Sequence, residues 1–485
     1  MTSMQDNLTL HTDKYQINMI YSHWIHGNAD QRVVFEVYFR KLPFGNGYAV
    51  FAGLERIIRY MENLHFGEEE IAYLQTQEEQ YKPEFLEELR QFRFTGNLYA
   101  VPEGTPVFAN EPMLIVEARV FEAQLIETAL LNFINYQTLI ATKASRIKQV
   151  APDDMLLEFG TRRAQEADAA VWGARAAYIG GFHATSNMRA GMMFGIPAKG
   201  THAHSWVQSH DTEEEAFRKY AEALPDGVTL LVDTYNTLTS GVPNAIKIGK
   251  LLEAHGKRMD GIRLDSGDLA YLSQEARKML DEAGLTYVKI VASNDLDENI
   301  IFNLKAQGAR IDIWGVGTQL ITAADQPSLG GVYKLVAREK DGQYMPVIKI
   351  SGNPEKVTTP GFKDMYRLIN RKTGKAEADY IVLRGETHVQ RGERIKLFDP
   401  THTYLQKHID NYDAIPLLKP IYKNGKLVYS IPSLDDVRAY QAQQLELFWP
   451  QYKRKLNPEM YRVNISDAAW KQKMDMLNQY QGQVE

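Results

Sequence analysis

The sequence predicts an α/β fold in which several strand–helix units follow one another and build a parallel sheet or a barrel. Between residues 154 and 325, short apolar strands alternate with helical stretches. The later strands recur about every 25–35 residues, the length of one strand–helix unit. The strands also end in clusters of polar residues. The chain has 485 residues, so we expect two or three domains.

The first part of the chain, to about residue 130, mixes strands and helices. Residues 33–40 (VVFEVYFR) alternate as a strand does, and residues 98–117 read as strands interrupted by two turns. The charged stretch 68–92 is predicted to be helical. A long helix is predicted over 121–149, because its apolar residues recur every three or four positions.

The middle of the chain carries the strand–helix units. We expect strands to end at 157–159, 180–182, 198–200, 231–233, 262–265, 290–293 and 313–315. Asp211 and Thr212 precede three glutamates, which favours a helix start there, and the Pro-Asp-Gly at 225–227 ends that helix.

The last part of the chain no longer shows the strand–helix pattern. Two hairpins are predicted, turning at 340–342 and 372–374, and from Leu434 on the pattern is mostly amphipathic helix with Ser466 as a cap. The expected division is an N-terminal α/β domain (1–130), a barrel with the active site (131–330), a hairpin region packing back on the N-terminal domain (331–400) and a mainly helical extension (401–485).

Composition excludes several function classes. The net charge is −6, and no basic stripe of the kind that binds nucleic acid is visible. No run of about 18 apolar residues occurs, and the polar N-terminus lacks a secretory signal, so we expect no membrane association. The chain has no cysteine, which removes disulfides and thiolate chemistry and fits a cytoplasmic protein.

Two adjacent arginines follow the first strand of the middle region. Arg162 and Arg163 offer forked donors suited to a phosphate or a carboxylate. The alternative is a structural salt bridge from one of them to Glu158 or Glu166.

Histidines and hydroxyls gather after the next two strand ends. Thr185 and Ser186 lie in one cluster, and His202 and His204 lie in the other. A histidine there can act as general base or accept a phosphoryl group, but each can equally be a structural core histidine. A metal site is disfavoured, because no Asp or Glu stands at a ligand spacing in this stretch.

The later strand ends carry charge and glycine. Asp233 ends one strand, and Arg263, Asp265 and Ser266 end the next, where the carboxylates could hold Mg²⁺ or sugar hydroxyls and the arginine an anion. The alternative is an ion pair between Arg263 and Asp265 that only seals the end of the barrel. Gly317 and Thr318 follow the last strand and can cradle a phosphate, or simply form a tight turn. The clusters together indicate a phosphorylated, hydroxyl-rich ligand with magnesium.

The motifs resemble those of the nicotinate phosphoribosyltransferase family along nearly the whole chain. They are, in order, TDKYQ (12–16), FEVYFRKLPF (35–44), EFGTRRAQ (158–165), GTHAHS (200–205), RLDSGDL (263–269), SND (293–295) and GVGT (315–318). The resemblance implies an irregular α/β barrel of the type II phosphoribosyltransferase kind, packed against an N-terminal α/β domain with a helical C-terminal extension. It implies a homodimer whose active site is shared across the interface.

The implied reaction joins nicotinate to phosphoribosyl pyrophosphate, giving nicotinate mononucleotide and pyrophosphate for NAD synthesis. ATP hydrolysis is coupled to it through a phosphohistidine, and Mg²⁺ is required. The phosphohistidine position matches His204, whereas His202 falls in a variable slot and receives no role.

The remaining family roles carry over to the matching positions. Phe159 would stack on the pyridine ring, with Tyr15 of the partner subunit on its other face. Arg162 and Arg263 would flank the base and phosphates, Asp233 and Asp265 would hold ribose hydroxyls or Mg²⁺, and Gly317 and Thr318 would cradle a phosphate. Thr185 and Ser266 are also expected to bind substrate, and His204, Asp265 and Arg263 to be catalytic.

Three rival functions remain from the sequence. Related nicotinamide enzymes place an aspartate where this chain has Ser186; an aspartate would repel the nicotinate carboxylate, so the serine favours the acid. A sugar-phosphate aldolase or isomerase on a barrel would need a Schiff-base lysine or an acid–base pair, and Lys199 is the lysine close to a strand end. A non-catalytic scaffold would be expected to lose His204 or the charges at 263–268.

Overall fold

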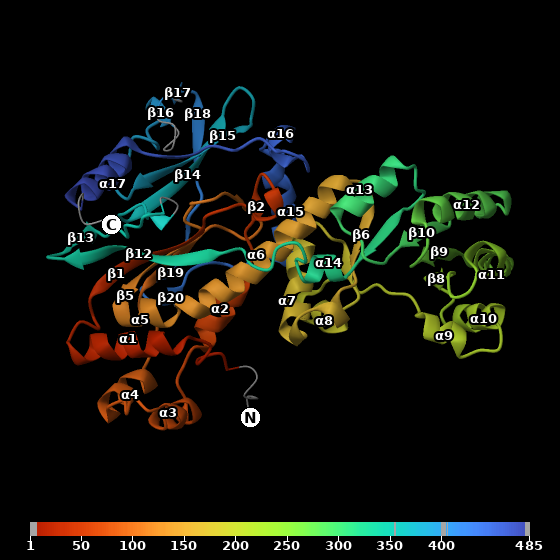
Figure 1. The fold of residues 1–485 in the computed structure, drawn as a ribbon, viewed down its shortest axis with the longest axis horizontal. Coiled ribbons are helices and arrows are strands. Elements are labelled where there is room, and N and C mark those ends of the chain that lie inside the picture. The colour runs from red at the N-terminus through yellow and green to blue at the C-terminus, as the bar shows by residue number, and fades with distance from the viewer. Residues whose placement is uncertain (1–6, 354–355, 399–403, 405, 481–485) are drawn as a thin grey trace. The chain divides into compact units, whose positions relative to one another are not determined.

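The computed structural model describes residues 7–353, 356–398, 404 and 406–480. The chain divides into two compact units (Figure 1). Unit 1 comprises Met1–Leu139 and Ser328–Glu485, and unit 2 comprises Ile140–Pro327. The boundary falls inside helix α6 (Glu127–Val150). No helix of the described residues is long and apolar enough to cross a membrane.

Unit 1 begins with a mixture of helices and strands, as the sequence predicts. Its N-terminal elements are α1 (Lys14–Ile25), β1 (Arg32–Phe39), β2 (Ala49–Val50), α2 (Leu54–Asn63), α3 (Glu68–Gln75), α4 (Pro83–Arg90), β3 (Asn97–Ala100), β4 (Pro106–Val107), β5 (Leu114–Arg119) and α5 (Val120–Leu125). The single long helix predicted over 121–149 is wrong in one respect, because the chain breaks at Ile126 between α5 and α6.

The second segment of unit 1 supplies further strands. Its elements are β12 (Gly331–Lys340), β13 (Gln343–Pro346), β14 (Lys363–Asn370), β15 (Ala376–Leu383), β16 (Ile395–Phe398), β17 (Gln406–Ile409), β18 (Tyr412–Pro416), β19 (Lys419–Lys423), β20 (Lys426–Leu427), α15 (Leu434–Glu446), α16 (Pro450–Lys453), β21 (Val463–Ile465) and α17 (Asp467–Gln479). Strands from both segments form one seven-stranded sheet, in the order β13-β12-β1-β5-β3-β19-β20.

The two predicted hairpins are confirmed, since β12 pairs with β13 and β14 with β15. The segment 401–485, expected to be mainly helical, also contains the strands β17 to β21. One signal for them lies in Asn424 and Gly425, which connect β19 to β20 with φ of 48° and 73°. Both values are positive, as a two-residue hairpin turn requires.

Unit 2 is built on a parallel sheet of six strands. The strands are β6 (Met155–Glu158), β7 (Ala184–Thr185), β8 (Val228–Leu231), β9 (Met259–Leu264), β10 (Lys289–Ala292) and β11 (Ile313–Val316), in the order β7-β6-β11-β10-β9-β8. The helices are α7 (Glu166–Ile179), α8 (Met188–Phe194), α9 (His204–Gln208), α10 (Glu213–Ala223), α11 (Val242–Ala254), α12 (Leu269–Glu282), α13 (Glu298–Ala306) and α14 (Thr318–Ile321). With β7 and β8 as its two edges, the sheet is a parallel half-barrel rather than a closed barrel.

Five of the seven expected strand ends are confirmed by β6, β8, β9, β10 and β11. The strand expected at 180–182 is wrong: α7 stops there, and Gly181 turns the chain with a φ of 108°. The strand comes just afterwards, as the two-residue β7. At 198–200 only a single bridge forms, from Ala198 to Thr185. The predicted helix start is confirmed, because the side chain of Thr212 accepts a hydrogen bond from the Glu215 amide.

Candidate active site

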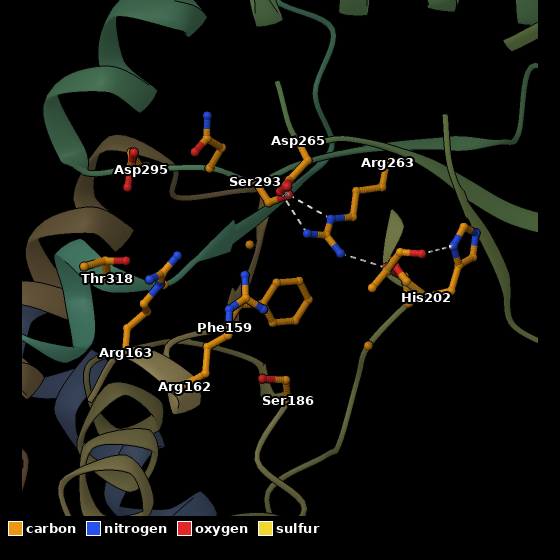
Figure 2. Close-up of a pocket in the computed structure, with 16 residues that line it drawn as sticks. Phe159, Arg162, Arg163, Ser186, His202, Arg263, Asp265, Ser293, Asp295 and Thr318 are labelled. Atoms are coloured by element: carbon orange, nitrogen blue, oxygen red, sulfur yellow. Dashed lines mark hydrogen bonds and ion pairs between the residues drawn. The ribbon is translucent and has the colours of Figure 1, made fainter. Parts of the chain in front are cut away.

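A cavity of about 330 Å³ opens at the carboxyl ends of the parallel strands of unit 2 (Figure 2). Seven of the residues singled out in the sequence line it: Phe159, Arg162, Ser186, Arg263, Asp265, Gly317 and Thr318. They come from the ends of β6, β7, β9 and β11, strands that neighbour one another or are separated by one strand in the sheet. Polar clusters far apart in sequence therefore meet in one place.

The ring of Phe159 forms an aromatic wall of this cavity. Its position depends on Gly315 in β11, because a Cβ at residue 315 would lie 2.6 Å from the Phe159 ring. The guanidinium of Arg263 lies 5.8 Å from the centre of the ring. The cavity thus combines a flat aromatic face with a nearby cation, a pairing suited to an aromatic anion.

Arg263 is fixed by three hydrogen bonds. Its Nε donates to Ser293 Oγ at 2.8 Å, and its Nη1 donates to Thr201 Oγ1 at 2.9 Å. Its Nη2 donates to Asp265 Oδ1 at 2.8 Å. The ion pair expected as an alternative to a binding role is therefore present, but the pair lines the cavity and so does not merely close the end of the sheet.

Asp265 connects the cavity to His204. Burial alone would raise the pKa of the Asp265 carboxyl, but the hydrogen bond from Ser293 and the charge of Arg263 outweigh it and hold this pKa below its ordinary value. Asp265 is thus an anion in the cavity wall. Its second oxygen, Oδ2, lies 3.8 Å from Nε2 of His204.

His204 itself is the first residue of α9 and does not line the cavity. Its Nδ1 lies 3.0 Å from Thr234 Oγ1, and its Nε2 lies 3.9 Å from Asp233 Oδ1. The side chain is 38% exposed, so a ligand can reach the ring. The structure brings together a histidine at the start of α9 and two carboxylates that follow β8 and β9.

Asp233, one of these two carboxylates, also contacts Ser266. Asp233 Oδ2 accepts hydrogen bonds from the Asp265 amide at 2.8 Å and from Ser266 Oγ at 2.6 Å. Asp233 Oδ1 is buried and has no hydrogen-bond partner among the described residues. This oxygen and Asp265 Oδ2 both lie beside His204 Nε2, and two carboxylate oxygens are a donor set that fits Mg²⁺ when phosphates and water complete the shell.

The other histidine of the motif, His202, has a structural environment. It is buried, and its Nε2 accepts a hydrogen bond from the Leu231 amide at 3.1 Å. Its ring packs edge-on against Tyr220, with centroids 4.9 Å apart. Burial lowers the pKa of His202, which keeps the ring neutral and able to accept. Among the described residues, no three or more His, Cys, Asp or Glu side chains are arranged so that they alone could hold a metal ion.

Thr185 lies outside the cavity lining. Its hydroxyl donates to Glu158 Oε2 at 2.6 Å and accepts from the Asn187 amide at 3.0 Å. Burial raises the pKa of Glu158. The Glu158 carboxyl also accepts from the Gly160 amide, so its hydrogen bonds go to Thr185 and Gly160 rather than to Arg162 or Arg163.

Tyr15 belongs to the other unit of the chain. It lies in the first turn of α1 and is 51% exposed. Its expected role as a residue from the partner subunit stays a prediction.

Several lining residues were missed as site candidates. They are Gly200, Thr201, Ala203, Ser293, Asn294, Asp295 and Gly315, whereas Arg163 and His202, which also line the cavity, were considered in the sequence but given no final role. Most sit inside motifs that the sequence displays, so proximity to a recognised residue was the available signal. Ser293 stands in the SND motif, but a serine after a strand is common, and the motif alone assigned it no role.

Comparison with known proteins gives matches along almost the entire chain. Sequence models match for the nicotinate phosphoribosyltransferase (NAPRTase) N-terminal domain at residues 10–135, for the nicotinate phosphoribosyltransferase (NAPRTase) family at 155–375, and for the nicotinate phosphoribosyltransferase C-terminal domain at 362–473. The chain is 56% identical to a nicotinate phosphoribosyltransferase of Bacillus subtilis (strain 168), covering 99% of this chain and 97% of the relative. It is 36% identical to one from Dictyostelium discoideum, covering 94% and 86%.

Solved structures agree with these matches. The crystal structure of human nicotinic acid phosphoribosyltransferase superposes with a TM-score of 0.86 at 31% identity, covering 96% of this chain and 99% of that one. A nicotinate-nucleotide pyrophosphorylase from Pyrococcus furiosus superposes with a TM-score of 0.69 at 24% identity, covering 92% and 97%, which shows a likeness of fold.

Proposed function

The chain belongs to the nicotinate phosphoribosyltransferase family and is an enzyme of nicotinate mononucleotide synthesis, and we propose that its chemistry takes place in the cavity lined by Phe159, Arg263 and Asp265. The observation that carries this proposal is the aromatic wall of Phe159 with the Arg263 guanidinium 5.8 Å away. Nicotinate is a flat aromatic ring with a carboxylate, and it meets both features at once.

In the transfer step, the nicotinate ring stacks on Phe159 and the arginines neutralise the anionic groups of both substrates. The lone pair of the pyridine nitrogen forms the bond to C1′ of the phosphoribosyl group. The bond from C1′ to the pyrophosphate oxygen breaks, and pyrophosphate leaves with that electron pair. Asp265 carries negative charge beside the place where positive charge develops on the ribose. Gly317 and Thr318 line the same cavity and hold the 5′-phosphate.

ATP hydrolysis enters through His204. A ring nitrogen attacks the γ-phosphorus, the bond to the bridging oxygen breaks, and ADP leaves; water later cleaves the phosphohistidine to phosphate. Asp233 and Asp265 would hold Mg²⁺, which shields phosphate charge when it is bound. Because His204 shares Asp265 with the cavity, a change in the charge of His204 alters the field at the transfer site.

Ser186 supports a preference for the acid over the amide. It lines the cavity, and its hydroxyl can donate to the nicotinate carboxylate without repelling it. The enzyme works as a homodimer in the cytoplasm, with Tyr15 of the partner subunit stacking on the second face of the nicotinate ring.

The test is product formation from phosphoribosyl pyrophosphate and Mg²⁺ with nicotinate or nicotinamide, each with and without ATP. We expect mononucleotide from nicotinate, in larger yield with ATP, and little from nicotinamide. His204→Ala should lose labelling by γ-labelled ATP while retaining a slow, ATP-independent transfer. Efficient use of nicotinamide would overturn the role of Ser186, and labelling of His204→Ala equal to that of the parent would overturn the role of His204.

A further inference from the structure

The hydroxyl of Ser293 lies between the two charged side chains of the cavity. It accepts the hydrogen bond from Arg263 Nε at 2.8 Å and donates to Asp265 Oδ1 (Figure 2). Ser293 is only 4% exposed, so water does not compete for these bonds. A serine hydroxyl has one proton and two lone pairs, which allows this pair of bonds and fixes their direction.

These contacts determine which donors of Arg263 remain for a ligand. A guanidinium has five N–H donors. Ser293, Thr201 and Asp265 each take one, so about two remain, and the plane of the group is set by bonds on three of its nitrogens. Arg263 therefore offers its free donors in a fixed orientation beside the Phe159 ring.

The same hydroxyl determines the orientation of Asp265. Oδ1 accepts from both Ser293 and Arg263. Oδ2 is left on the side of His204, 3.8 Å from Nε2. Among the described residues, Ser293 is thus in contact both with the arginine that faces the nicotinate ring and with the carboxylate that faces the histidine.

The backbone around Ser293 holds its side chain in this position. Its amide donates to the carbonyl of Leu264 at 3.0 Å, which attaches Ser293 to the end of β9 between Arg263 and Asp265. The next two residues, Asn294 and Asp295, have φ of 89° and 45°. Two consecutive non-glycine residues in the left-handed region cost free energy, and such strain is concentrated at functional sites.

We propose that Ser293 is a positioning residue for both half-reactions, orienting Arg263 for phosphoribosyl transfer and Asp265 for the phosphorylation of His204. This inference rests on the proposed roles of Arg263, Asp265 and His204. It goes beyond them by assigning the alignment of both half-reactions to one hydroxyl, through its bonds to Arg263 and Asp265.

The experiment compares Ser293→Ala with Thr201→Val in the full-length enzyme. Thr201→Val removes one contact of Arg263 and none of Asp265, so it serves as the matched variant for the transfer step alone. Two rates are measured: kcat/KM for nicotinate without ATP, and formation of phosphoenzyme from γ-labelled ATP without nicotinate. A thermal melt of each variant reports whether it folds.

We expect both variants to lose roughly tenfold or more in kcat/KM for nicotinate, the effect of removing one hydrogen bond to a charged group. Only Ser293→Ala should also slow phosphoenzyme formation by a similar factor. The rate of phosphoenzyme formation should fall clearly less in Thr201→Val. Ser293→Thr, which keeps the hydroxyl, should recover both rates in part.

The outcomes separate this inference from the function on which it rests. A parent enzyme that forms no mononucleotide would overturn the proposed function itself. An active parent with Ser293→Ala unchanged in either rate, or with the same losses as Thr201→Val, would overturn the dual role of Ser293. Should Ser293→Thr fail to fold, the comparison of Ser293→Ala with Thr201→Val still decides.

Discussion

His202 and His204 stand two positions apart in the sequence, yet their surroundings suit them to different roles. His204 is partly exposed and faces two carboxylates, whereas His202 is buried and accepts a hydrogen bond from the Leu231 amide. The sequence alone shows the pair but not the difference, because burial is a property of the folded chain. His202 anchors the loop that presents His204.

This anchoring predicts a pH dependence of stability. Burial lowers the pKa of His202 from its ordinary value of 6.5. The unfolded chain therefore binds a proton that the folded chain does not, over the range between the lowered value and 6.5. The contribution of His202 to the free energy of unfolding is complete above that range and is lost as pH falls through it.

The measurement is urea unfolding at about pH 8 and about pH 5. His202→Gln keeps an acceptor near the position of Nε2 but cannot titrate, so it should lose less stability between the two conditions than the parent does. His202→Leu should be less stable at both, by about 1–3 kcal/mol, because the Leu231 amide is left buried without a partner. An equal pH response in the parent and His202→Gln would contradict this account.

Among the elements, strand β11 determines where the aromatic wall of Phe159 lies, because its residue 315 is a glycine. Gly315 leaves the space that the Phe159 ring occupies, since a Cβ there would lie 2.6 Å from the ring. We expect Gly315→Ala to displace the ring and raise KM for nicotinate about tenfold or more, with a smaller effect on KM for phosphoribosyl pyrophosphate. Steady-state kinetics with each substrate varied in turn would check this.

A control for that variant lies elsewhere in the lining of the same cavity. Gly200→Ala also lies in the cavity lining, but a Cβ there meets nothing within 4 Å. It should change KM for nicotinate little. If Gly315→Ala behaves like Gly200→Ala, Phe159 is not the wall on which the base binds.

The strands of unit 2 were largely predictable because each is an apolar run followed by polar residues. The exceptions have physical reasons. β7 has only two residues, too few for a hydrophobic pattern, and the glycines at 180 and 181 that looked like a strand end are the stop of α7. The half-barrel shape depends on which strands pair. The local sequence of β7 and β8 does not indicate that they are edge strands that do not pair with each other.

The candidate site was predictable as a set of residue types but not as a geometry. The strand-end rule brings Arg263 and Asp265 to the cavity. It cannot tell that Asp233 Oδ1 lacks a partner or that Ser293 bridges Arg263 to Asp265, because both depend on neighbours 28 or more residues away.

At the scale of the whole molecule, the chain forms unit 1 from two segments separated by all of unit 2. Strand β1 of the first segment pairs with β12 of the second along seven residue pairs. The sequence suggested four consecutive segments, since local patterns do not reveal which distant strands share a sheet. The division at about residues 130, 330 and 400 stays a prediction.

The proposed sharing of the site between two subunits can be tested with the whole dimer. Tyr15 belongs to unit 1 and His204 to unit 2. If Tyr15 serves the site of the partner subunit, Tyr15→Ala and His204→Ala damage two different contributions to each site. Each variant alone should then lack full ATP-coupled activity, and two differently tagged variants can be co-expressed to form hybrid dimers.

In such a hybrid, one site combines the intact His204 of one subunit with the intact Tyr15 of the other, and the second site carries both defects. Random pairing makes about half of the dimers hybrids with one good site in two, so the mixture should show about a quarter of the parent's ATP-coupled activity. Purification through both tags should raise this to about half. If Tyr15 instead serves its own subunit, every site in the hybrid carries one defect, and activity stays at the level of the single variants. Recovery of ATP-coupled activity in the hybrids therefore requires a site built by two chains. If activity does not recover, Tyr15 serves the site of its own chain or no site at all.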